Sequence, residues 1–470
     1  MKKLLAMLLT LCLVAGMTGA VAAAEDVVTL KWVTVGSGMP TNYDAWLEKI
    51  NPYLAEKIGV NIDMEVISWA DWDNRRNVIV NTNEPFDIIF GNMNVYNTDV
   101  KLGAYLDITE LLETSAPELK AMIPDMFWDA CRVDGRIYAV PTYKDNAQTN
   151  YIIWDKELLD ANGIDASQAT TFESMTPIFE QLKDKASTAV FPLSKSGATY
   201  LLYQYDQMSA GLPAIGVRHD DPEGKVVAVL EQEDVQGYLK TFHEWYKAGY
   251  INADAATLPE DNKYKVCSIA QGWSGAAATT WGPNMGVEAV AYQWGEGVVS
   301  NETVRGSLNS ISVNCEHPEK ALAFLQLINT DPYVRDSFYY GLEGDDWVYT
   351  EDGRVHRNDA DWTMAGYTQA TFFNVTITDD LDFNQWDEVK ELNEKAEPSV
   401  LLGFNFDTTA VQDQLMSCIE IFNRYKGEIL TGTTDPAESV AQMMQEMRDA
   451  GFDEIAAEAQ AQVDAFLAAK

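Results

Sequence analysis

A single stretch in the first third of the chain, residues 132–164, predicts a junction between two folded bodies. Asp134 and Gly135 form a tight-turn dipeptide between β-prone flanks, and Pro141 cannot continue a strand ladder. An apolar run at residues 151–154 then begins a new strand just before a capped helix. A hairpin, an exposed crossing, and then a fresh strand and helix are the features expected of a hinge.

The length of the chain agrees with two bodies. A chain of 470 residues exceeds what one hydrophobic core usually supports. Hydrophobic residues make up 47% of it, which is ample for packed cores. The 13 Trp and 21 Tyr residues exceed what burial alone needs, so we expect some aromatic side chains on the surface or in a cleft.

The mature N-terminal region alternates strand and helix. Apolar, β-branched segments at residues 27–35, 60–67 and 86–91 are separated by segments of helical period at 43–58 and 69–80. This alternation predicts a parallel sheet with helices on its faces. Ligands of such sheets bind outside the carboxyl ends of the strands, where this sequence has Ser37 and Asn92.

Residues 1–24 have the pattern of a secretory signal peptide. Two lysines precede an apolar run, and three small residues end at Ala24. The apolar run is shorter than the roughly 20 residues that a bilayer span needs. Cys12 lies inside this run, directly after a leucine where a lipoprotein signal would have a small residue. We therefore expect an extracytoplasmic mature chain that begins after Ala24 without a lipid anchor.

The chain is strongly acidic, which excludes some partners. Its formal net charge of -39 becomes -41 once the signal peptide, with two lysines and no acids, is removed. Such a chain repels nucleic acid and anionic membrane surfaces. The charges are dispersed along the sequence and form no acidic tail, so they indicate a solvated surface.

The residues that usually carry catalysis or bind metals are scattered. No histidine has partner spacing, and no metalloprotease helix, phosphate-binding loop or calcium loop occurs. The adjacent carboxylates Asp220-Asp221 and Asp345-Asp346 differ from glycosidase pairs, which come from separate elements. We therefore expect no cofactor, no metal and no enzymatic activity. Four cysteines survive processing without a zinc or redox motif, as buried thiols or as disulfides: Cys131, Cys267, Cys315 and Cys418.

Four segments of the chain, in order, resemble the family 1 extracellular solute-binding proteins of ABC importers. They are DGRIYAVP with the following YIIWDKELLDANGI, then YKVCSIAQGW, and finally HPEKALAFLQLINTDP. The resemblance implies a two-lobed, periplasmic-binding-protein-like α/β fold in which each lobe is a mostly parallel sheet flanked by helices. It assigns residues 25–144 and about 312–350 to the first lobe. Residues 145–311 and about 351–470 form the second, with crossings near 143–148 and 311–314.

The resemblance also implies a function. Members of this family capture a solute between the lobes by hinge closure and deliver it to the transmembrane subunits of an ABC permease, and the resemblance favours an oligosaccharide as cargo. We expect a monomer. A peptide or another polar solute is the alternative cargo. A secreted glycan-cleaving enzyme and an adhesive surface module are alternative functions, although no repeats or wall-anchoring tail support the latter.

Sugar sites combine aromatic platforms with hydrogen-bonding side chains. Trp273 is the leading candidate, because Gly272 and the Ser274-Gly275 pair leave its indole few bulky neighbours, although it could also be a core residue. The other candidate platforms are Trp281, Trp386, Tyr143 and Phe404. The candidate hydrogen-bonding residues are Asn92, Asp145, Asn405 and Ser37.

Overall fold

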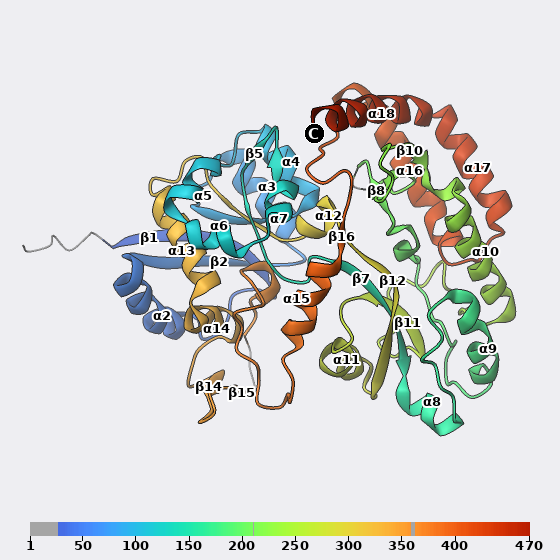
Figure 1. Cartoon of the computed structure of the whole chain (residues 1–470), viewed down its shortest axis with the longest axis horizontal. Coiled ribbons are helices and arrows are strands. Elements are labelled where there is room, and N and C mark those ends of the chain that lie inside the picture. The colour runs from blue at the N-terminus through green and yellow to red at the C-terminus, as the bar shows by residue number, and fades with distance from the viewer. Residues whose placement is uncertain (1–26, 210, 359–361) are drawn as a thin grey trace, which may run out of the picture.

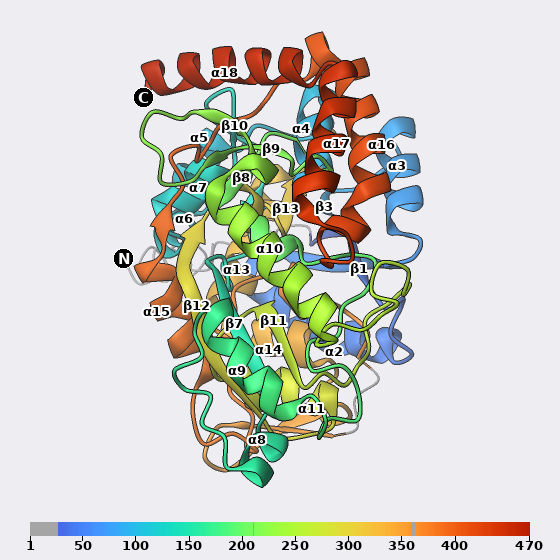
Figure 2. The same cartoon turned by 90° about the vertical axis from the view of Figure 1, so that its right-hand side faces the viewer.

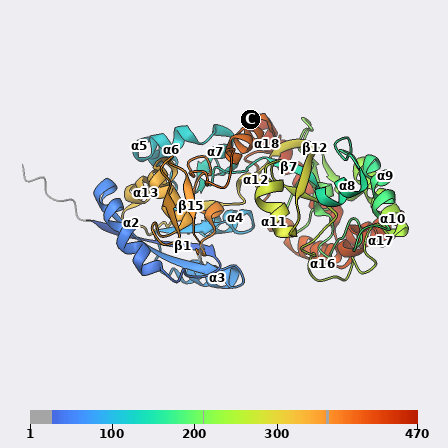
Figure 3. The ribbon, with the colours of Figure 1, turned by 90° about the horizontal axis from the view of Figure 1, so that it is seen from below.

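The computed structural model of the protein describes residues 27–209, 211–358 and 362–470. The predicted signal peptide, with Cys12, lies outside these residues. The described chain forms two lobes that lie side by side (Figures 1 and 3), and each has its own hydrophobic core. The expected two-lobed α/β fold is confirmed.

The first lobe is built on a five-stranded sheet with the order β2-β1-β3-β13-β6. β1 is parallel to β2 and β3, as the strand and helix alternation predicts, whereas β13 runs antiparallel to β3 and β6. The strands are β1 (Val28–Gly36), β2 (Val60–Ser68), β3 (Ile88–Gly91), β6 (Val140–Pro141) and β13 (Leu308–Ile311).

Helices cover both faces of this sheet (Figure 1). In α2 the buried side chains Trp46, Ile50 and Leu54 recur every four residues, and Gly59, with a φ of 66°, ends the helix in the left-handed conformation. The helices of this lobe are α2 (Tyr43–Ile58), α3 (Trp72–Thr82), α4 (Met93–Lys101), α5 (Thr109–Ser115), α6 (Pro117–Met122), α7 (Asp125–Ala130), α13 (Pro318–Thr330) and α14 (Pro332–Tyr340).

The sheet of the second lobe differs from the predicted one. Its order is β11-β7-β12-β16, and β7 runs antiparallel to both neighbours, so the prediction of a mostly parallel sheet is wrong here. The long excursion between β7 and β11 consists of helices and short strands, and the chain returns from it in the opposite direction. The strands are β7 (Gln148–Asp155), β11 (Cys267–Gln271), β12 (Ala289–Val299) and β16 (Glu397–Pro398).

A smaller antiparallel sheet and a layer of helices complete the second lobe. In Figure 2, α10, α16 and α17 form its outer face and α18 lies across their end. The small sheet contains β8 (Tyr205–Gln207), β9 (Ile215–Arg218) and β10 (Val226–Ala228). The helices are α8 (Lys156–Asn162), α9 (Phe172–Leu182), α10 (Glu233–Ala248), α11 (Gly282–Met285), α16 (Gln412–Ile429), α17 (Pro436–Asp449) and α18 (Phe452–Ala469).

The predicted hinge stretch has the expected local structure. β4 (Arg132–Val133) pairs with β5 (Arg136–Ile137) through a turn in which Asp134 and Gly135 have φ values of 50° and 78°. Two consecutive positive φ values are what a tight two-residue hairpin requires. After the crossing, β7 begins, and the Asp155 carboxylate caps α8 by accepting a hydrogen bond of 2.9 Å from the Leu158 amide.

Three stretches of the described chain pass between the lobes. The first precedes β7, the second follows β12 through α12 (Asn301–Val304), and the third follows α15 (Gln385–Lys395) through β16. A small third core lies beside this last path and includes side chains of the hairpin formed by β14 (Trp347–Tyr349) and β15 (Val355–Arg357). Its buried residues are Tyr340, Trp347, Val355, Phe372, Val375, Trp386 and Val389. The exact lobe boundaries stay predictions, although pairing assigns β13 to the sheet of the first lobe.

All four cysteines of the mature chain are free thiols. Cys131, Cys267 and Cys418 are buried and Cys315 is half-buried. Burial raises the pKa of the Cys131 and Cys315 thiols to about 12 and that of Cys418 to about 11. Among the described helices, none combines the length and apolar character needed to cross a membrane.

Candidate binding cleft

A cleft of about 510 Å³ lies between segments of both lobes, and we call it the aromatic compartment. The carboxyl end of β1 positions one wall: the Ser37 amide donates to the Thr363 carbonyl (2.8 Å), and the Thr363 hydroxyl donates to the Gly38 carbonyl (2.6 Å). These bonds hold the segment that follows Thr363 at the cleft. The aromatic lining residues are Trp273, Tyr339, Tyr340, Trp362, Tyr367, Phe372 and Trp386.

Trp273 forms part of the opposite wall, on the loop after β11. The Glu388 carboxylate on α15 accepts hydrogen bonds from the amides of Ser274 (2.8 Å) and Gly275 (3.1 Å), which fixes this loop. The Trp273 ring lies 5.7 Å from that of Trp386, and its indole nitrogen is buried without a hydrogen-bond partner among the described residues. The Trp273 ring is therefore partly packed, and its indole N–H has no hydrogen-bond partner among the described residues.

Two further aromatic residues stack on each other at the first lobe's side of the cleft. Trp69 and Tyr367 are 45% and 43% exposed, with ring centroids 6.1 Å apart and planes 6° from parallel. Trp69 follows β2, and its amide donates to the Gly36 carbonyl at 3.2 Å. Neither residue is among the candidates predicted from the sequence, although the position of Trp69 directly after a strand of the parallel sheet is a signal for it.

Four of the five candidate aromatic residues fall into three groups. Trp273 and Trp386 line the aromatic compartment. Trp281 lies behind this wall, because its ring packs against Gly272 and is 6.0 Å from Tyr151. Tyr143 is buried, with its ring 4.5 Å from that of Phe373.

Asn92 and Asp145 lie at a neighbouring, polar part of the space between the lobes. Asn92, Lys144, Gln148 and Gln271 line a space of about 380 Å³ at the carboxyl end of β3. Asp145 forms an ion pair of 2.7 Å with Lys144, and its carbonyl accepts a hydrogen bond from Gln271 at 3.3 Å. Ser37 is exposed after β1 and contributes its backbone to the first wall.

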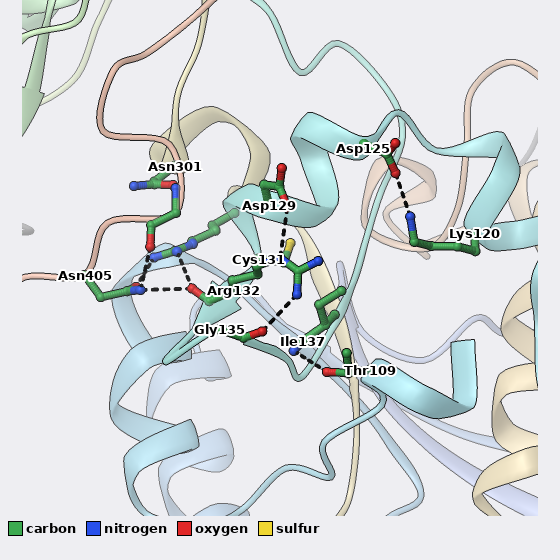
Figure 4. A network of polar contacts seen from close by, with 12 residues as sticks. Thr109, Lys120, Asp125, Asp129, Cys131, Arg132, Gly135, Ile137, Asn301 and Asn405 are labelled. Carbon is green, nitrogen blue, oxygen red and sulfur yellow. Dashed lines mark hydrogen bonds and ion pairs between the residues drawn. The ribbon is translucent and has the colours of Figure 1, made fainter. Parts of the chain in front are cut away.

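Asn405 and Phe404 lie in a connection between the lobes that we call the strap, residues 399–407. Figure 4 shows Asn405 beside Arg132 of the first-lobe hairpin. Asn405 donates to the Arg132 carbonyl (2.9 Å) and accepts a hydrogen bond of 2.7 Å from Arg305, whose side chain is only 3% exposed. Phe404 is buried, with its ring 5.5 Å from that of Phe466.

The described acidic and histidine side chains have mainly structural partners. Asp346 accepts hydrogen bonds from Asn42 and from the Leu342 amide. The His219 ring bonds to the Gln204 carbonyl, and burial lowers the pKa of His219. Within the described ranges no three His, Cys, Asp or Glu side chains gather as they would around a metal ion.

A cleft with aromatic walls between two lobes is the arrangement expected of a solute-binding protein, a class of protein that closes on its ligand. Residues 48–340 match the family model described as bacterial extracellular solute-binding protein, and the chain belongs to this family. The expected resemblance is thereby confirmed. Residues 400–468 also match a domain of unknown function, DUF3502, which covers α16, α17 and α18.

Proteins of Streptococcus pneumoniae are similar to this chain over nearly its whole length. A carbohydrate ABC transporter substrate-binding protein of serotype 4 (strain ATCC BAA-334 / TIGR4) is 27% identical over 463 residues, which cover 95% of this chain and 92% of the relative. The crystal structure of the N-glycan transport solute binding protein NgtS is also 27% identical, with a TM-score of 0.85 over 93% of this chain and 99% of that chain. Its complex with Man1GlcNAc has a TM-score of 0.77 at 26% identity, over 94% and 99% of the two chains.

Proposed function

We propose that this protein is the substrate-binding component of an ABC importer and captures an oligosaccharide between its lobes. The observation that carries the proposal is the aromatic compartment, in which aromatic side chains from separate segments face one space. Sugar rings present apolar C–H faces that pack on such side chains. The similarity to a carbohydrate-transport protein and to an N-glycan-binding protein supports this class of cargo.

The proposed ligand contacts come from both walls. Trp273 and Trp386 supply apolar faces on one side, and Trp69 and Tyr367 supply an exposed stack on the other. The side chains of Thr279 and Gln385 line the same space and offer hydrogen bonds to sugar hydroxyl groups. The remaining candidates, Asn92, Asp145, Ser37, Trp281, Tyr143, Phe404 and Asn405, stay predictions.

Ligand binding is proposed to close the two lobes about the crossings. The TM-score falls from 0.85 against the NgtS structure described without a ligand to 0.77 and 0.73 against its complexes with Man1GlcNAc and Man5GlcNAc. A change in lobe arrangement lowers such a score without a change in sequence, which supports closure. The proposal includes an extracytoplasmic monomer that docks on the permease, carries no lipid, binds no nucleic acid and has no catalytic activity.

Calorimetry tests this function. The purified mature chain is titrated with Man1GlcNAc, Man5GlcNAc, other oligosaccharides and short peptides. We expect binding to at least one oligosaccharide, no release of reducing ends and a smaller radius of gyration in solution scattering with ligand. Peptide binding without glycan binding would instead support the alternative cargo, and new reducing ends would support a glycan-active enzyme.

A further inference from the structure

A second space opens into the second lobe on the other side of β7, and we call it the polar chamber. Its volume is about 430 Å³, within the range of about 300–1,000 Å³ that is usual for small-molecule sites. Its lining includes Gln148, Asn150, Tyr200, Asp206, Gln271 and Lys426. Gln148 and Gln271 also line the space beside Asn92, so the chamber opens toward the region between the lobes.

The polar chamber and the aromatic compartment lie on opposite faces of one strand. Successive side chains of a strand point to opposite faces. On β7, the Tyr151 hydroxyl donates to Glu388 at 3.4 Å, on the side of the Trp273 loop. Asn150 therefore points to the other face, together with Ile152, which belongs to the core of the second lobe.

The end of β11 separates the two spaces. Gln271, the last residue of this strand, lines the polar chamber, and Trp273, two residues later, lines the aromatic compartment. The two spaces share no lining residue among those described. A single sugar ring therefore cannot occupy both, whereas a longer or branched glycan can pass around this strand end.

Two side chains at the polar chamber have hydrogen-bonding capacity that the described protein leaves unused. Asn150 is 1% exposed, and its amide nitrogen has no partner among the described residues. The buried hydroxyl of Tyr200 has none either. A buried polar group without a partner is destabilising, so such groups are rare unless they serve another purpose.

Neighbouring polar groups in the same wall are satisfied. The Tyr205 hydroxyl donates to Asp234 at 2.9 Å, and the Tyr203 hydroxyl accepts from Gln204 at 3.2 Å. Asp206 accepts a hydrogen bond from Ser399. Among the described residues that line the chamber, the unused groups belong to Asn150 and Tyr200.

We propose that the polar chamber is a second ligand subsite, which holds a sugar ring of a glycan whose other part lies in the aromatic compartment. A sugar hydroxyl both donates and accepts hydrogen bonds, so one hydroxyl group can accept from the Asn150 amide nitrogen and another can bond to the Tyr200 hydroxyl. The amide side chains of Gln148 and Gln271 at the mouth offer further donors and acceptors. This inference rests on the proposed function and assigns the larger glycan two contact regions.

Two substitutions remove the unused groups while nearly preserving side-chain size: Tyr200→Phe and Asn150→Leu. Neither removes a described hydrogen bond, so the melting temperature of the ligand-free protein should be unchanged or raised. Tyr238→Phe is the matched control. The rings of Tyr200 and Tyr238 both meet Trp294 edge to face, at 6.2 and 5.9 Å, but Tyr238 does not line the chamber.

The experiment measures the affinity of the full mature chain for Man5GlcNAc and Man1GlcNAc by calorimetry. We expect Man5GlcNAc to bind Tyr200→Phe about three- to tenfold more weakly and Asn150→Leu about tenfold more weakly, with Tyr238→Phe unchanged. Man1GlcNAc, which can occupy the aromatic compartment alone, should bind all three variants as it binds the wild type.

The outcomes separate this inference from the function on which it rests. Unchanged Man5GlcNAc affinity in both chamber variants, with binding by the wild type, overturns the subsite and leaves the oligosaccharide function standing. Weakened binding of both glycans supports the chamber and assigns the disaccharide to it. Failure of the wild type to bind either glycan overturns the subsite and counts against the proposed function; binding of other oligosaccharides would still support that function.

Discussion

The strap and the polar chamber each contain an asparagine, and the two asparagines differ in whether their hydrogen-bonding groups have partners within the protein. In the strap, the Asn405 amide nitrogen donates hydrogen bonds to the carbonyls of Arg132 and Gly403, and its side-chain oxygen accepts one from Arg305. In the chamber, the amide nitrogen of Asn150 has no described partner. The comparison teaches that the type of a polar residue does not mark a ligand site, whereas unused hydrogen-bonding capacity beside a cavity points to one.

The largest expected effect tests the strap. The Arg305 guanidinium donates to the Ala130 carbonyl at 2.6 Å and to Asn405, so Arg305→Leu leaves buried acceptors without a donor. We expect the free energy of unfolding to fall by about 3 to 5 kcal/mol, measured by denaturant titration. Arg136→Leu, on the β4–β5 hairpin, where Arg136 is exposed and paired with Asp107, is the control and should cost at most about 1 kcal/mol. Equal losses of unfolding free energy in the two variants would show that the buried contacts of Arg305 stabilise the protein no more than an exposed ion pair does.

Trp273→Ala tests the cleft. Removal of this ring should weaken glycan binding by about 2 to 4 kcal/mol if, as proposed, its apolar face stacks on the ligand. The ligand-free protein should lose less stability than it does in Trp347→Ala, where a fully buried ring is lost at a cost of about 3 to 5 kcal/mol. Calorimetry and denaturant unfolding measure the two quantities. A stability loss as large as that of Trp347→Ala, with affinity retained, would make Trp273 a core residue.

Asp206, in the chamber wall, predicts a pH dependence of stability. Burial raises the pKa of its carboxyl to about 7, so between about pH 4 and 7 the folded state binds more protons than the unfolded state. The contribution of Asp206 to stability is therefore present at low pH and is lost as pH rises from about 4 through about 7, by about 4 kcal/mol in total.

Asp206→Asn should abolish this dependence in unfolding experiments from about pH 2 to 8, a range that also includes the titration of a carboxyl with a lowered pKa. Asp107→Asn is the control of opposite sign. Hydrogen bonds from Thr109 and the charge of Arg136 outweigh partial burial and lower the pKa of Asp107, so its contribution is lost as pH falls. An unchanged pH profile in Asp206→Asn would contradict a neutral carboxyl in the chamber wall.

The smallest expected effect concerns the exposed ion pair between Lys101 of α4 and Asp407 at the end of the strap, at 3.2 Å. Both side chains are more than half exposed, so Lys101→Ala should change the free energy of unfolding by less than about 1 kcal/mol. The difference should disappear in about 1 M salt, where charges are screened within about 3 Å. A difference that persists in high salt would mean that Lys101 acts through the packing of its side chain or through helix propensity, and not through this ion pair.

Local sequence chemistry was sufficient to predict the hinge stretch and one edge of the cleft. The Asp134-Gly135 turn and the capped α8 depend on neighbouring residues, and both occur as predicted. The parallel strands β1, β2 and β3 also follow from alternation along the chain, so the loops after them could be named as candidate positions.

Features that depend on distant segments could not be predicted in this way. The antiparallel direction of β11 against β7 is set by the path of the chain between them, and no periodicity within either strand encodes it. Phe373 covers Tyr143, and Tyr367 stacks on Trp69, through contacts between residues far apart in the sequence. The unused donor of Asn150 became apparent only when every partner around it was known.

The four described cysteines are protonated thiols, so the proposed lobe closure is accessible to chemical labelling. Thiol reagents react with the thiolate, and burial raises the pKa of all four groups well above neutral pH. A cysteine introduced at an exposed site on each lobe, Val78→Cys on α3 and Met416→Cys on α16, would therefore react in preference to the native ones. A fluorophore pair at these sites converts the opening and closing of the cleft into a distance that can be followed in real time without first removing any natural cysteine.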